Sequence, residues 1–137
     1  MDKELILFPV LVQVLLTISL YVSLNVLKKR AVAAEEVDEA RRALYDDAWP
    51  EYVLKINNCI KNQFEVPVLF YVLVLAHVSL NAVNGFAVGI AWLFVLSRIV
   101  HAYIHTGSNH VPTRRRVFTV GVILVLALSF NLSVALF

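Results

Sequence analysis

Three polar side chains stand at helical spacing just before the second apolar stretch of the sequence. Asn58, Asn62 and Glu65 occupy positions i, i+4 and i+7, so a helix places all three on one face. Pro67 follows at once and removes the backbone hydrogen bond to the carbonyl of Gln63. Polar and ionisable groups at the edge of an apolar stretch are costly, and they usually face a bundle interior or a cavity. We therefore predict a binding site at this place.

A second polar face ends the third apolar stretch. Arg98, His101 and His105 stand at i, i+3 and i+7 and share a helix face. With Arg114–Arg116 and Lys28–Arg30, they form a basic ring around one carboxylate, that of Glu65. The simpler alternative is an internal Glu65–Arg98 ion pair with a purely structural role.

Metal and thiol chemistry are less well supported by the sequence. His101 and His105 have the spacing that lets two imidazoles share a metal, and Glu65 could complete a set of two histidines and one carboxylate as metal ligands. Only four histidines are present, however, and a di-iron hydroxylase needs several His-rich motifs. A single cysteine, Cys59, excludes an intramolecular disulfide and a thiolate cluster within the chain. We predict no metal site and interpret Cys59 as a passive small residue.

The elements that must position these residues are membrane helices. The chain has 137 residues, 60% of them hydrophobic, and a mean hydropathy of +0.76, which is too apolar for a soluble domain of this size. Four apolar stretches can each cross about 30 Å of hydrocarbon, which takes about 20 helical residues. We predict an all-α, four-helix integral membrane bundle that fills residues 1–137 as one domain, with spans at about 5–27, 66–83, 86–105 and 117–137.

The distribution of charge predicts the orientation of the bundle. Of the 12 basic residues only Lys3 lies outside Lys28–Lys61 and Arg98–Arg116. The positive-inside rule places both of these regions in the cytoplasm and both termini on the other side. The first apolar stretch is not read as a signal peptide, because its basic residues follow it. The net charge of +2 gives no indication of nucleic-acid binding.

The segments around the spans are expected to be partly helical. We predict one long helix over Trp49–Leu80 and a cytoplasmic, partly helical segment over residues 28–65. Within it, the charge pattern of Ala31–Asp47 predicts a helix, and Asp46 or Asp47 could cap the helix that follows.

Polar residues also mark the first stretch and the outer turn. Asn84-Gly85 indicates the turn into the third span. The first stretch carries a polar stripe, for which we prefer a role in helix packing, with a water-filled cleft as the alternative. The stripe has a spacing of four: Gln13, Thr17, Tyr21 and Asn25.

These patterns together resemble the MAPEG superfamily, the membrane-associated proteins of eicosanoid and glutathione metabolism. The resemblance rests on the order of four spans, on N-x-x-E before the second span, and on R-x-x-H-x-x-x-H at the end of the third. The segments NQFEVPVLFYVL and AWLFVLSRIVHAYIHTGSNHVPTRR are most similar to bacterial members, of the type of microsomal glutathione S-transferase. The similarity covers Phe64–Phe118 well and the first helix only by its topology.

The resemblance implies a homotrimer that binds glutathione between neighbouring subunits on the cytoplasmic side. Asn62 and Glu65 match the family's helix-2 signature Arg-x-x-x-Asn-x-x-Glu, whereas Asn58 stands at its Arg position. Arg98 matches the arginine near the end of the family's third helix. Arg114, sixteen residues later, lies close to where the family places the arginine that faces the thiol.

The function implied is glutathione transferase or peroxidase chemistry on lipophilic electrophiles, with glutathione as co-substrate and Arg114 as the catalytic residue. Loss of the arginine at position 58 removes a bidentate partner for a carboxylate. A non-catalytic module that binds a lipid or lipophilic ligand therefore stays open, as does a purely structural bundle. Expected partners are the bilayer (the inner membrane in a bacterium), other copies of the chain and a lipophilic small molecule, but not nucleic acid. The expected binding residues are Asn58, Asn62, Glu65, Arg98, His101 and His105.

Overall fold

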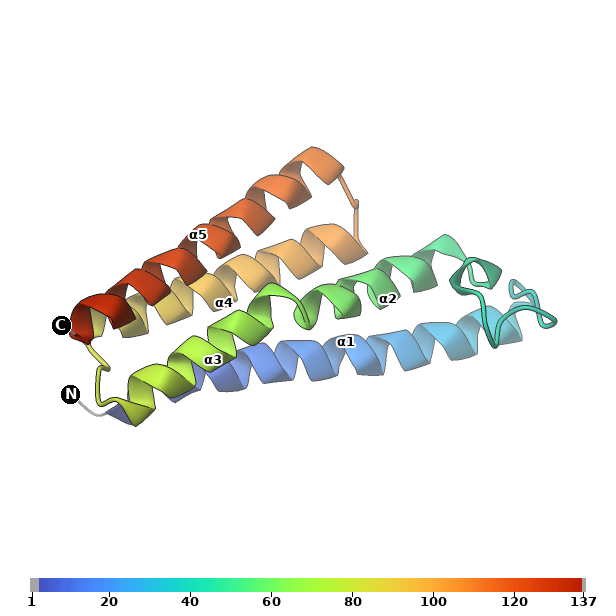
Figure 1. Cartoon of the computed structure of the whole chain (residues 1–137). Helices are drawn as coiled ribbons and strands as arrows, with labels where there is room; N and C mark the ends of the chain where they lie inside the picture. The colour runs from blue at the N-terminus through green and yellow to red at the C-terminus, as the bar shows by residue number, and fades with distance from the viewer. Residues whose placement is uncertain (1–2, 137) are drawn as a thin grey trace.

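The computed structural model describes residues 3–136, and every regular element in that range is a helix (Figure 1). Four rods are long and apolar enough to cross a membrane. Three of them are single helices or a helix with its short 3-10 extension, and α2 and α3 together form the fourth, of 29 residues. The predicted all-α, four-helix membrane architecture is confirmed. In chain order the helices are η1 (Lys3–Ile6), α1 (Leu7–Ala33), η2 (Asp46–Ala48), α2 (Glu51–Gln63), α3 (Val66–Ser79), α4 (Gly85–Thr106) and α5 (Val111–Ala135).

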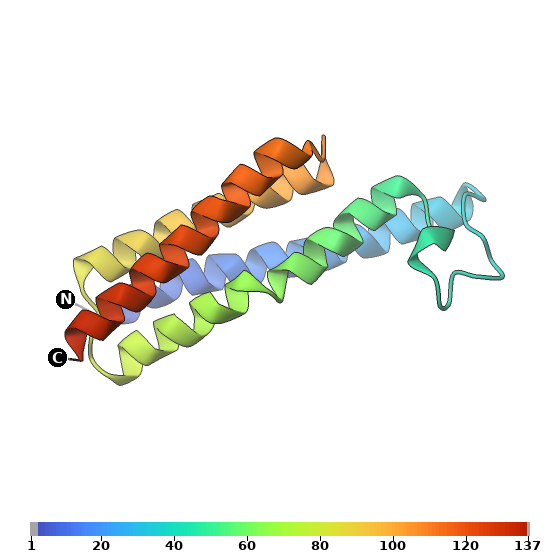
Figure 2. The same cartoon turned by 45° about the horizontal axis from the view of Figure 1, so that its top comes forward.

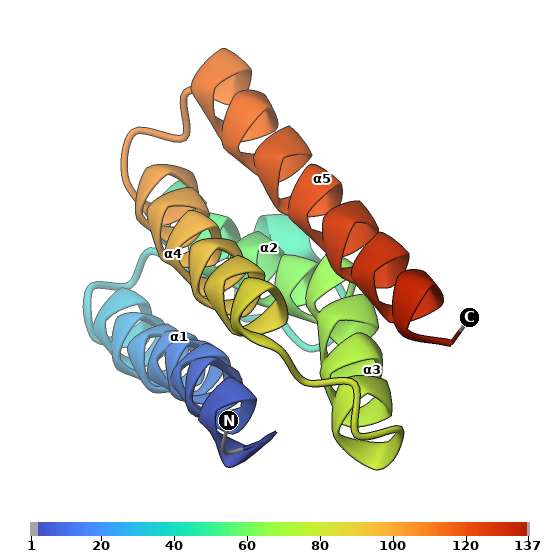
Figure 3. The ribbon, with the colours of Figure 1, turned by 90° about the vertical axis from the view of Figure 1, so that its left-hand side faces the viewer.

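The rods pack around α4, which contacts both α1 and α5 (Figure 3). Near the chain termini the core is aromatic and aliphatic, and the rings of Phe70 and Phe94 stack with centroids 4.4 Å apart. A smaller cluster around Leu20, Ile56 and Cys59 fills the other half of the bundle. Many large apolar side chains on the outer faces are exposed, as expected where lipid or another subunit covers them.

Asn84 is the N-cap of α4, at the turn that the sequence indicates. Its Oδ1 accepts a hydrogen bond from the backbone N–H of Ala87 at 2.9 Å, which caps the helix. Its amide donates to Oδ1 of Asn131 at 3.2 Å, and Nε2 of the buried His77 lies 3.2 Å from the same oxygen. These contacts tie the ends of α3, α4 and α5 together.

The expected single helix over Trp49–Leu80 is broken at Phe64 and Glu65, so that prediction was wrong. Pro67 has no N–H to donate to the carbonyl of Gln63, and its ring clashes with that carbonyl in a continuous helix. The chain ends α2 at Gln63, gives Glu65 non-helical angles of φ −101° and ψ −107°, and restarts as α3 at Val66. The side chain of Glu65 therefore does not continue the stripe of α2.

The expected helix over Ala31–Asp47 is also absent. α1 runs on to Ala33, and residues 34–45 form turns in which Arg41 binds Asp47 through contacts of 3.0 and 2.9 Å. Pro50 is the N-cap of α2 and no side chain caps it, so neither aspartate has the predicted capping role. Residues 34–50 project beyond the α4–α5 hairpin (Figures 1 and 2), and we call this side of the bundle the loop end.

A buried amide pair joins the first two rods. Nε2 of Gln13 donates to Oε1 of Gln63 at 2.8 Å, and the two residues are 0% and 2% exposed. Gln63 in turn donates to the backbone carbonyl of Cys59 at 3.2 Å. Of the polar stripe on α1, Gln13 therefore has the packing role, whereas Tyr21 and Asn25 are exposed.

We expect Gln63→Leu to lower the free energy of unfolding by about 1 kcal/mol, because it leaves the amide of Gln13 buried without an acceptor. The double variant Gln13→Leu/Gln63→Leu should recover most of this loss. Unfolding in detergent micelles measures both, with Asn25→Leu on the exposed face as the control. Purely additive losses in the double variant would contradict the pairing.

Candidate functional site

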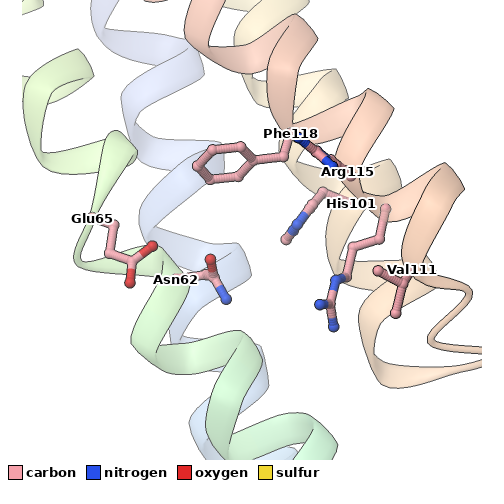
Figure 4. A pocket seen from close by; sticks show the side chains of 7 residues that line it. Asn62, Glu65, His101, Val111, Arg115 and Phe118 are labelled. Carbon is pink, nitrogen blue, oxygen red and sulfur yellow. The ribbon is translucent and has the colours of Figure 1, made fainter.

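A cleft of about 290 Å³ opens beside the break between α2 and α3. Figure 4 shows Asn62 and Glu65 on one wall and His101 and Phe118 on the opposite wall. The break matters here because it ends α2 just after Asn62 and turns the following backbone. The residues that line the cleft are Asn62, Glu65, His101, Val111, Arg114, Arg115 and Phe118.

Four of these residues come from the first two turns of α5. Pro112 is tolerated in the first turn, where its missing N–H would have no helical partner. Arg114 is half-buried and its Nη1 donates to Oδ1 of Asn109 in the linker before α5. Asn109 adopts a left-handed φ of 52°, which an asparagine tolerates better than most residues. The linker therefore holds one guanidinium at the rim of the cleft.

Arg98 lies behind the cleft rather than in it. Arg98 is only 1% exposed, and its Nε, Nη1 and Nη2 atoms have no hydrogen-bond partner within residues 3–136. The guanidinium carbon lies 5.5 Å from the ring centroid of Phe118 and 6.0 Å from that of Phe94. Gly121 of α5 lies beside the group without crowding it, since even a Cβ there would stand at an ordinary contact distance of 3.6 Å from Nη1. Aromatic faces give partial compensation for a buried cation, and they do not replace an anion.

The two histidines of α4 are buried side by side. Their rings meet edge-on with centroids 5.5 Å apart, and the Nδ1 atoms of both have no partner within the described residues. His101 also lies 6.0 Å from the ring of Phe118. Only His101 reaches the cleft, whereas His105 is 4% exposed and does not line it. Within residues 3–136 no group of three or more His, Cys, Asp or Glu side chains is placed to hold a metal.

The cleft thus contains four of the seven residues expected from the sequence. Asn62, Glu65, His101 and Arg114 line it. Asn58 is exposed on α2, and its carbonyl accepts a hydrogen bond from Asn62 at 3.0 Å. Two lining residues, Val111 and Phe118, were not singled out from the sequence, and Arg115 was named only as part of the basic ring. With Arg114, these three residues form an i, i+3, i+4, i+7 pattern from the first residue of α5, which marks their shared face.

The structural ion pair between Glu65 and Arg98 is not formed. Within residues 3–136 no ion pair of 4.0 Å or less joins them, and Glu65 is exposed while Arg98 is buried. The surroundings of the cleft are therefore electropositive. Arg114 and Arg115 line it, Arg98 lies behind its wall, and Glu65 is the one carboxylate among the lining residues.

We expect Arg98→Met to raise the free energy of unfolding of the ligand-free protein by about 1 kcal/mol, because it removes a buried charge without a partner. Glu65→Gln should change it by less than about 0.5 kcal/mol, as at other exposed positions. Unfolding in detergent measures both variants. A loss of about 3–5 kcal/mol on either substitution would instead reveal an ion pair that holds the fold together.

Comparison with known proteins gives one result. The model of the MAPEG family matches residues 6–134, a range that includes nearly all of the four rods and every residue that lines the cleft. No curated protein and no solved structure matches the chain. The match covers nearly the whole sequence and confirms the resemblance drawn from its motifs: the chain belongs to the MAPEG family.

Proposed function

We propose that the cleft binds glutathione and activates its thiol for attack on a lipophilic electrophile or hydroperoxide. The observation that carries this proposal is the charge pattern of the cleft, with Glu65 on one wall and Arg114 and Arg115 on α5. Glutathione has two carboxylates and one ammonium group, which is the complementary pattern. The family to which the chain belongs includes glutathione transferases and related membrane proteins.

Each lining residue has a role in this proposal. Glu65 binds the ammonium group, and Asn62 binds an amide or carboxylate, since its side chain both donates and accepts. Arg115 offers a bidentate partner for a carboxylate. Arg114, held by Asn109, faces the sulfur. Arg98 acts from behind the wall by making the cleft more favourable for anions.

The chemical step begins with loss of the thiol proton to solvent. A free thiol has a pKa of about 8.5, so only a few per cent is the nucleophilic thiolate at neutral pH. Lowering this value by about 2 units takes about 2.7 kcal/mol of preferential stabilisation of the anion. A half-buried guanidinium within hydrogen-bond reach is suited to supply it. The thiolate then forms a bond to the electrophilic atom as the leaving group departs with its electron pair.

Binding without turnover is the second candidate, and two observations favour it. Asn58 replaces the arginine of the family signature, which removes one cation from the site. A larger pocket of about 480 Å³ adjoins the cleft and shares Val111 and Arg115 with it. Its other lining residues are Pro112, Arg116 and Thr119. This mixture of cationic, polar and apolar groups suits the binding of an amphiphile without catalysis.

We further propose that the protein is a homotrimer with its sites between subunits and with the loop end in the cytoplasm, as the positive-inside rule indicates. Two features support the shared site. The cleft of about 290 Å³ is open on one side and is small for a tripeptide, since ligand pockets usually have about 300–1,000 Å³. Asn58, expected to contact the ligand, is exposed on α2 and does not line this chain's own cleft.

Thiolate formation tests the enzymatic proposal. We expect glutathione bound to the unmodified protein to show ultraviolet thiolate absorbance, and Arg114→Ala to abolish it. Arg115→Ala should weaken binding in calorimetry and keep the absorbance at saturation, while Arg116→Ala, which lies outside the cleft, should change neither. Equal small losses in all three variants would reduce the arginines to membrane anchors. Binding without any thiolate signal would favour the non-catalytic module.

Oligomeric state tests the shared site. Native mass spectrometry in mild detergent should give trimers, and glutathione should bind to trimers only, because each chain supplies part of each site. A clean monomer that binds glutathione with unchanged affinity would contradict a site between subunits.

A further inference from the structure

A second pocket, of about 350 Å³, lies at the loop end on the side of α1. We call it the Lys28 pocket. The last two turns of α1 form one wall, and the loop folds back to supply the other with Arg42 and Trp49. Three side chains of its lining are cationic and none is acidic. The residues that line it are Lys28, Lys29, Val32, Ala33, Arg42 and Trp49.

The lysines of the Lys28 pocket have no anionic partner within residues 3–136. Nζ of Lys28 lies 4.8 Å from the ring centroid of Trp49, and Lys29 makes no hydrogen bond or ion pair with a described residue. Arg42 contacts Glu39 at 2.9 Å, through Nε alone. The other acidic side chains of the loop and α2 that form contacts use different partners: Glu36 with Tyr52, Asp38 and Asp47 with Arg41, Asp46 with Lys61, and Glu51 with Lys55.

The depth of the Lys28 pocket matches the headgroup layer of a bilayer. A helix rises about 1.5 Å per residue, and about 20 residues cross the hydrocarbon, so a span that enters near Leu7 leaves it near Leu27. Below the pocket, α1 exposes an apolar stripe that leads at helical spacing to Lys29. Its members are Leu15, Ile18, Val22 and Val26, with exposed fractions of 63%, 51%, 60% and 58%. A cationic pocket above an apolar stripe has the two-part chemistry of a phospholipid.

We propose that the Lys28 pocket binds the headgroup of an anionic phospholipid, with its phosphodiester between Lys28, Lys29 and Arg42 and its acyl chain along the α1 stripe. Trp49 provides the flat, amphipathic surface that tryptophan commonly gives at a membrane interface. The bound lipid fastens the loop onto α1, because Arg42 and Trp49 come from the loop and the lysines come from the helix. This lipid site is separate from the cleft and does not depend on glutathione.

Native mass spectrometry tests the proposal. The detergent-purified protein is first exchanged into mixed micelles that contain either phosphatidylglycerol or phosphatidylcholine. We expect phosphatidylglycerol to be retained and phosphatidylcholine not. Each lysine near an anionic surface contributes about fivefold in affinity, so Lys28→Gln/Lys29→Gln should weaken phosphatidylglycerol binding by about 25-fold. The matched control is Lys3→Gln/Lys55→Gln, which removes two charges outside the cleft and both pockets and should leave retention unchanged.

A second variant separates the shape of the pocket from its charge. Val32→Trp fills the Lys28 pocket without altering any charged group, and we expect it to prevent retention of phosphatidylglycerol. Soluble glycerol phosphate should not displace the lipid, because it lacks the acyl chain. Equal weakening in the control double variant, retention by Val32→Trp, or equal retention of phosphatidylcholine would each overturn the proposal and leave the lysines as ordinary membrane anchors.

Discussion

One missing hydrogen bond determines the shape of the site. Pro67 cannot donate to the carbonyl of Gln63, so the second rod cannot run as one helix. The break keeps the polar half and the apolar half of the rod in separate helices, and it leaves Glu65 outside both. Gln63, the last residue of α2, is held by Gln13 at the same level. The position of the cleft therefore depends on the break between α2 and α3, and the buried Gln13–Gln63 hydrogen bond holds the end of α2 beside that break.

The sequence predicted the four rods because the thickness of a bilayer dictates the length of an apolar stretch. It did not predict the loop. The charges of Ala31–Asp47 have the spacing of a helix surface, yet the pairs that form include Arg41 with Asp47, six residues apart. A helix held by local i, i+4 pairs competes with contacts that the loop can make only after α1 and α2 have packed together. The break was predicted in part, since the loss of a hydrogen bond at Pro67 was recognised but the end of a helix there was not.

The sequence located the helices that border the cleft better than the faces that are open to it. Four of the seven expected site residues line the cleft: Asn62, Glu65, His101 and Arg114. Arg98, on the same face of α4 as His101, is covered by α5 instead. Which part of a helical face is open depends on how two helices rotate against each other, and side-chain spacing alone does not contain that rotation. The roles of these residues toward a ligand remain predictions.

The enclosure of Arg98 has a consequence for how the chain enters the membrane. A lone α4 must carry an arginine into the edge of the lipid, and inserting an arginine costs up to about 2.5–3.5 kcal/mol, the value at the centre of a membrane helix. α5 lowers this cost by placing the ring of Phe118 over the guanidinium of Arg98. Only residues 107–110 separate the two helices. We therefore expect α4 and α5 to leave the translocation machinery together, as a preformed hairpin, and the first two rods to assemble against that hairpin.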